Sequence, residues 1–154
     1  MALIMLGNGL QGTLIGVRAT LEGFPPAVTG FVMSGYFVGF LFGSTLAPKL
    51  MWQVGHVRVY AGLASLASTA TLAHLIVINP FAWGIFRIVT GFCLAGLYIV
   101  AESWLNGAST NQNRGKLLSL YMLTFSIAIP SSQGHIRYGD PEGFKLNNLA
   151  TLLV

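Results

Sequence analysis

The chain has 154 residues, of which 54% are apolar and 8% are charged, and its mean hydropathy is +0.70. Soluble domains carry charge on about a quarter of their residues, so this composition excludes an ordinary soluble protein and indicates an integral membrane protein. The net charge is +4, but the basic residues occur one or two at a time, unlike a nucleic-acid-binding surface. We therefore expect the lipid bilayer, and no nucleic acid, as the partner.

Apolar stretches of about 20 residues, long enough to cross a hydrocarbon core of about 30 Å, divide the chain into an up-and-down bundle of transmembrane helices. A fifth stretch is interrupted at Pro130 and spans only if its helix continues through the proline. The last nine residues resemble the start of a further span. A helix of nine residues rises only about 14 Å, which is too short to cross the bilayer. We expect one transmembrane domain with spans at 1–17, 27–47, 59–78 and 81–101, an interrupted span at 117–136 and an incomplete one at 146–154.

The first span carries a polar stripe. At about 100° per residue, Asn8, Gln11 and Arg18 fall within an arc of about 80°. Amides in hydrocarbon need hydrogen-bond partners, and a neighbouring helix or a substrate cavity would supply them equally well. Arg18 lies at the water boundary four residues before Glu22, which favours an ion pair or a side chain that extends to the interface.

The second span carries a ridge of glycines. Gly35, Gly39 and Gly43 recur every four residues, so they share one helix face and permit close approach of another helix. Tyr36 is either a hydroxyl that lines a cavity or a ring that packs against a neighbour.

The connections between spans indicate the topology. The 47–58 loop contains Lys49 and Arg58, and the 105–116 loop contains Arg114 and Lys116. Basic loops face the cytoplasm, so we expect the N-terminus to be cytoplasmic.

The fourth span contains Arg87, which keeps its proton and costs roughly 2.5 kcal/mol or more at the centre of a bilayer. We expect its side chain to face a cavity, although it lies about 9 Å from the outer end of its helix and could extend to the interface instead. Gly91, Leu94, Tyr98 and Glu102 share its stripe, and Tyr98 is a further candidate for the substrate or proton pathway. Glu102 has two interpretations, an ion pair with a basic loop or a role in gating.

Residues for catalysis or metal binding do not form a recognisable set. The chain has four carboxylates, one cysteine inside a span, no pair of histidines at metal-ligand spacing, and no nucleophile or phosphate-binding motif. We expect neither an enzyme nor a cofactor or metal. His74, alone in the third span, is interpreted as a packing residue in preference to a proton carrier.

Three motifs together resemble the major facilitator superfamily of secondary transporters. RIVTGFCLAG, from Arg87, is similar to the Arg-x-x-x-Gly pattern of its fourth helix, and GYFVGFLFGS, from Gly35, with the basic residues of 47–58 is similar to its signature between helices two and three. Arg114-Gly115-Lys116 resembles the start of its fifth helix. QGTLIGVRATLEGF and YIVAESWLN resemble the bacterial YcaD-like branch, across about residues 1–125.

The resemblance implies a bacterial inner-membrane transporter of two six-helix halves with a small-molecule substrate between them, of which this chain matches the N-terminal half. A second copy or a C-terminal half would complete the cavity. The loop signature lacks the family's usual aspartate. A non-transporting structural subunit, or an inactive fragment, is the alternative. In the transporter hypothesis Arg87 binds substrate or a proton, and the polar helix faces add Asn8, Gln11, Tyr36 and Tyr98 as candidates for the same pathway. The glycines interpreted as helix-packing residues are Gly35, Gly39, Gly43 and Gly91. The candidates for gating at the cytoplasmic side are Gly43, Lys49, Gly55, Arg58, Glu102 and Arg114.

Overall fold

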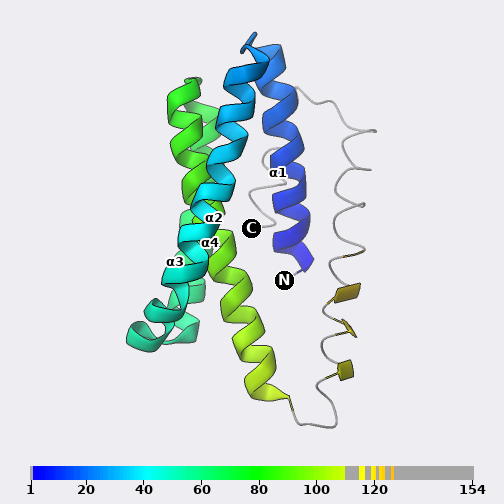
Figure 1. The fold of residues 1–154 in the computed structure, drawn as a ribbon, viewed down its shortest axis with the longest axis vertical. Helices are drawn as coiled ribbons and strands as arrows, with labels where there is room; N and C mark the ends of the chain where they lie inside the picture. The colour runs from blue at the N-terminus through cyan, green and yellow to red at the C-terminus, as the bar shows by residue number, and fades with distance from the viewer. Residues whose placement is uncertain (1, 110–114, 117–118, 121, 124–125, 127–154) are drawn as a thin grey trace.

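A computed structural model of the chain describes residues 2–109, 115–116, 119–120, 122–123 and 126. Residues 2–109 form four helices that alternate in direction, with no strand among the described residues (Figure 1). The predicted all-α fold is confirmed for this part of the chain, whereas the predicted fifth and sixth segments lie largely outside the described residues. The helices are α1 (Ala2–Leu21), α2 (Pro26–Val54), α3 (His56–Ile76) and α4 (Pro80–Ala108).

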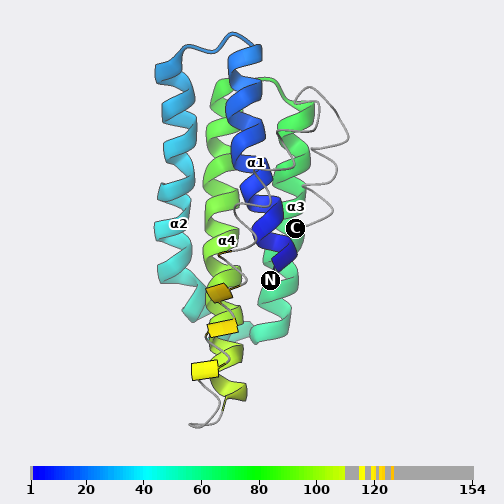
Figure 2. The same ribbon diagram turned by 90° about the vertical axis from the view of Figure 1, so that its right-hand side faces the viewer.

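The central helix is α4. It packs along α2 on one side and α3 on the other, while α2 and α3 have few contacts with each other, and α1 lies across the same group (Figure 2). Cys93, Leu94 and Leu97 of α4 are almost completely buried. On α2, by contrast, Phe31 and Leu41 are exposed. An apolar helix surface of this kind is suited to contact with lipid, since lipid chains are as apolar as these side chains.

Two apolar clusters hold the helices together. One joins Met51 of α2, Leu63 of α3 and Leu97 of α4. The other joins Ile15 of α1 to Trp83 of α4, with Phe24 and Met33 among its neighbours. The first cluster packs the middle and last parts of α4 against α2 and α3, and the second packs its first turns against α1 and α2.

Glycines set the distance between α2 and α4. A Cβ atom on Gly39 would collide with the backbone carbonyl of Ile88, and one on Gly91 would collide with the carbonyl of Tyr36. A Cβ atom on Gly35 would lie 3.0 Å from the carbonyl oxygen of Gly84. Because the colliding atoms belong to the backbone, no rotamer change relieves the overlap, and the two helices approach this closely only with glycine at these positions.

The second connection differs from the sequence-based prediction of a loop over 47–58. In the structure α2 continues to Val54 in spite of Pro48, and only Gly55, with a φ of 93°, separates it from α3. Proline removes one backbone hydrogen bond, but Ala47 and Met51 are buried against the bundle, so tertiary packing maintains the helix through this turn. Gly55 ends the helix because glycine adopts a positive φ without a steric cost.

The start of α4 is fixed by capping. The Asn79 side-chain oxygen accepts hydrogen bonds from the backbone nitrogens of Phe81, at 2.9 Å, and Ala82, at 3.5 Å, and Pro80 occupies the first helical turn. These bonds satisfy two backbone donors that have no partner within the helix.

Replacing Asn79 by alanine is therefore expected to lower the free energy of unfolding by about 1 kcal/mol. The measurement is unfolding of the chain in mixed micelles, followed by circular dichroism. Asn106→Ala, on the exposed last turns of the same helix, serves as the control and is expected to change stability by less than about 0.5 kcal/mol. Equal losses in the two variants would contradict a capping role for Asn79.

Two of the described helices, α2 and α4, are long and apolar enough to cross a membrane. The first and third helices extend over most of the predicted spans 1–17 and 59–78. Among the described residues, length and hydropathy identify only α2 and α4 as candidate membrane spans. A membrane crossing by α1 and α3 therefore stays a prediction.

Candidate functional site

A polar pocket lies where α1, α2 and α4 approach one another. Its volume is about 260 Å³. Three of the residues predicted for the substrate pathway, Asn8, Tyr36 and Arg87, come together here although they lie on three different helices. The pocket is lined by Asn8, Gly9, Gly12, Thr13, Met33, Tyr36, Phe37 and Arg87.

Helix geometry explains how each element contributes to the pocket. Asn8 and Gly12 are four residues apart and share a face of α1, while Met33 and Tyr36 are three apart and share a face of α2. A Cβ atom on Gly12 would lie 3.7 Å from Nη2 of Arg87, which places this part of α1 directly beside the guanidinium. Small residues on α1 therefore leave room for the arginine and for the space next to it.

The guanidinium of Arg87 is buried but poorly paired. The residue is only 3% exposed. Its Nη2 donates to Sδ of Met33 at 3.1 Å, and its Cζ lies 5.8 Å from the centre of the Tyr36 ring. Its Nε has no hydrogen-bond partner among the described residues. A thioether is a weak acceptor and a ring face a weak counter-charge, so these contacts replace little of the hydration that burial removes.

No described carboxylate neutralises Arg87. The only two carboxylates in the described part of the chain are Glu22 and Glu102. Glu22 pairs with Arg18 across 3.5 Å, as the sequence indicated. Glu102 is exposed and lies fifteen residues further along α4, about 22 Å from Arg87 along the helix axis. The pocket therefore has a positive charge with no negative partner among the described residues.

The other pathway candidates lie in different surroundings. The amide of Asn8 donates to the Tyr36 hydroxyl at 3.4 Å, so these two side chains link α1 and α2 within the pocket. Gln11 is 2% exposed and its Nε2 lacks a partner among the described residues, but it does not line the pocket. Tyr98 is half-buried, with its ring 6.4 Å from that of Phe40, and is also absent from the pocket wall.

Four of the six predicted gating residues lie at one end of the bundle, where α2 and α4 end and α3 begins (Figure 2). Lys49, Arg58 and Glu102 are exposed there, and Gly55 forms the connection. Gly43 is different, because it is buried against α4 and belongs to the glycine contact. Arg114 lies outside the described residues. At this end His56 Nε2 lies 3.1 Å from Ser103 Oγ and so connects α3 to α4.

The sequence analysis did not single out Met33 or Phe37, and it gave Gly12 no role beside Arg87. The available signal was helical spacing, since Gly12 follows Asn8 by four residues and Met33 precedes Tyr36 by three. The structure shows why this spacing matters, because both pairs face Arg87.

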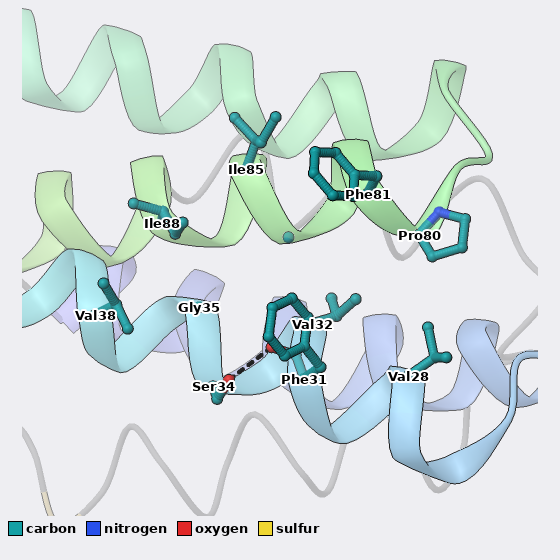
Figure 3. Close-up of a pocket in the computed structure, with 11 residues that line it drawn as sticks. Val28, Phe31, Val32, Ser34, Gly35, Val38, Pro80, Phe81, Ile85 and Ile88 are labelled. Atoms are coloured by element: carbon teal, nitrogen blue, oxygen red, sulfur yellow. Dashed lines mark hydrogen bonds between the residues drawn. The ribbon is translucent and has the colours of Figure 1, made fainter.

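A second pocket, of about 330 Å³, lies between the first halves of α2 and α4 (Figure 3). Its walls are almost entirely apolar, with Phe31, Val32 and Val38 from α2 facing Phe81 and Ile85 from α4. Its one hydroxyl side chain, that of Ser34, already donates to the carbonyl of Phe31 at 2.7 Å. This pocket offers no group that would orient a polar substrate, so the pocket at Arg87 is the better candidate site.

Known proteins similar to this chain share one description. The chain is 33% identical over 126 residues to an uncharacterized MFS-type transporter of Enterobacter sp. strain 638, which covers 81% of this chain and 33% of that protein. It is 34% identical over 126 residues to the uncharacterized MFS-type transporter YcaD of Escherichia fergusonii, again 81% of this chain and 33% of the relative. A third relative, from Yersinia enterocolitica, is 28% identical over 131 residues, or 85% of this chain and 34% of the relative. The chain is related to the major facilitator transporters.

This relationship confirms the resemblance that the motifs indicated and shows that the chain is a membrane protein. The chain spans about a third of the length of the curated relatives that it matches. No protein-family model matches it, and no solved structure does.

Proposed function

We propose that the chain is part of a secondary transporter of the major facilitator type, which moves a small molecule across the bacterial inner membrane. The observation that carries this proposal is the pocket at Arg87. It combines a buried charge with three further polar side chains, those of Asn8 and Thr13 from α1 and Tyr36 from α2. Buried ionisable groups in membrane helices mark substrate or ion pathways, because their cost is high and packing alone does not require them. The names of the relatives support the same conclusion.

In transporters built from two related halves, the substrate site lies at the interface between the halves, near the middle of the bilayer. This chain corresponds to about a third of its relatives and so supplies one side of such an interface. In the proposal it resembles the N-terminal six-helix half, and a C-terminal half or a second copy closes the pocket. The side chain of Phe37, which is largely exposed, lies on the part of the pocket wall where this partner would pack.

The orientation follows from the distribution of charge. Lys49 and Arg58 are exposed at the end of the bundle where α2 meets α3, whereas Arg18, at the opposite end, is paired with Glu22. By the positive-inside rule the end with Lys49 and Arg58, which form no ion pair among the described residues, faces the cytoplasm, and so does the N-terminus. In this orientation Lys49, Arg58 and Glu102 lie at the cytoplasmic entrance, where changes in their contacts would accompany opening and closing.

Transport is tested by comparing solute uptake and export in bacterial cells that produce the chain, its Arg87→Gln variant or its Arg18→Gln variant. Mass spectrometry of isotope-labelled medium components follows the solutes, and immunoblotting of membranes confirms equal amounts of protein. We expect at least one solute to move about tenfold faster with the wild-type chain and Arg18→Gln than with Arg87→Gln.

Arg18→Gln is the matched control because it removes a positive charge of the same kind from α1, where the partly exposed ion pair with Glu22 contributes little to stability. If no solute distinguishes cells that contain the chain in their membranes from cells that lack it, the proposal fails. The chain would then be a non-transporting membrane subunit.

A further inference from the structure

We propose that the pocket between α1, α2 and α4 binds a small organic anion, with Arg87 pairing with its carboxylate and Met33 and Phe37 contacting its apolar body. This inference rests on the proposed function, since it names the chemical class of substrate for the same pocket.

The charge of the pocket selects the class of ligand. Arg87 is a permanent cation, and the described residues that line the pocket include no carboxylate. Asn8 adds an amide that donates hydrogen bonds, and Tyr36 adds a hydroxyl. A cationic ligand would be repelled there, and a neutral one would leave the guanidinium without a counter-charge. An anion supplies the missing counter-charge to the guanidinium.

The edge of the guanidinium formed by Nε and Nη2 has the geometry to pair with a carboxylate. Among the described residues Nε has no hydrogen-bond partner, and Nη2, on the same edge of the planar group, donates to the weakly accepting sulfur of Met33. A carboxylate that accepts from both nitrogens forms two parallel charge-assisted hydrogen bonds, the strongest arrangement available to arginine. Lysine, with a single point charge, does not reproduce this geometry.

The rest of the wall fits the uncharged part of the ligand. Phe37, Met33 and the ring of Tyr36 present apolar surface, while Gly9 and Gly12 keep α1 from filling the space beside them. The volume of about 260 Å³ is slightly below the range of roughly 300 to 1,000 Å³ that is typical for drug-sized ligands. A carboxylate attached to one small apolar group is therefore the appropriate probe.

Three aromatic probes of similar size and different charge test the proposal: benzoate, benzamide and benzylammonium. Binding of each labelled probe is measured by equilibrium dialysis against the full chain in lipid nanodiscs. We expect benzoate to bind at least about tenfold more tightly than benzamide, with benzylammonium weakest, because only benzoate pairs with the guanidinium. The preference for benzoate should disappear in Arg87→Gln, fall several-fold in Arg87→Lys and remain unchanged in Arg18→Gln.

Equal binding of benzoate and benzamide, or a preference for benzoate that survives Arg87→Gln, would overturn the proposal. The chain also has two carboxylates outside the described residues, Asp140 and Glu142. If benzoate binds only after the double change Asp140→Asn and Glu142→Gln, the protein's own carboxylate is the partner of Arg87 and the proposal is wrong.

The uptake experiment separates this proposal from the proposed function. Movement of a neutral or cationic solute that depends on Arg87 would support transport and contradict the anion site. Binding of benzoate that depends on Arg87, in a chain that moves no solute, would support the anion site and contradict transport.

Discussion

Replacing Gly39 by alanine is expected to lower the free energy of unfolding by about 3 kcal/mol, at the upper end of the usual cost of overpacking. The added methyl group would collide with the backbone carbonyl of Ile88, which has no alternative rotamer, so α2 and α4 must separate. These two helices form the most extensive contact in the described bundle, and their separation also loosens the packing around Arg87. Unfolding by increasing fractions of sodium dodecyl sulfate, followed by circular dichroism, measures the loss.

Gly30→Ala is the matched control, because it makes the same chemical change in the same helix at a position where a Cβ atom meets nothing within 4 Å. Alanine favours helix over glycine by about 1 kcal/mol, so Gly30→Ala is expected to be neutral or slightly stabilising. If Gly39→Ala is tolerated as well as Gly30→Ala, the α2–α4 distance described here is incorrect.

Replacing Arg87 by methionine is expected to raise the free energy of unfolding by about 1 to 3 kcal/mol and to abolish the preference for benzoate. Methionine has a similar length and no charge, so it removes the cost of a buried guanidinium, which insertion measurements put at about 2.5 to 3.5 kcal/mol at the centre of a membrane helix. An increase in stability combined with a loss of binding is characteristic of a residue kept for function.

The opposite result would show that Arg87 is a structural residue. A loss of more than about 2 kcal/mol in Arg87→Met would mean that the arginine bridges groups needed for folding, as breaking a buried ion pair costs about 3 to 5 kcal/mol. Val100→Met, also on α4 and away from the pocket, controls for the effect of introducing methionine into the buried part of this helix. We expect it to be destabilised by overpacking, so stabilisation in Arg87→Met would not be a general effect of methionine.

The sequence alone determined that residues 2–109 contain four helices and which positions permit close contact. Apolar length placed the start of each helix to within three residues, because a segment that crosses lipid must satisfy its own backbone hydrogen bonds, but α2 and α4 each extend seven residues beyond the predicted span. The four-residue spacing of Gly35, Gly39 and Gly43 defined the ridge that lies against α4. The cost of a charge in hydrocarbon likewise singled out Arg87 before any contact was known.

The tertiary structure decided which residues meet. Lys49 belongs to a helix, not to a loop, because the buried contacts of Met51 hold α2 together beyond Pro48, and local sequence does not reveal such contacts. Tyr98 shares a face of α4 with Arg87, but it does not line the pocket. Helical spacing predicts which residues share a face, whereas the position along that face at which another helix approaches depends on tertiary packing. The pairing of Arg87 with Met33 joins positions 54 residues apart, and only the packing of α2 on α4 brings them together.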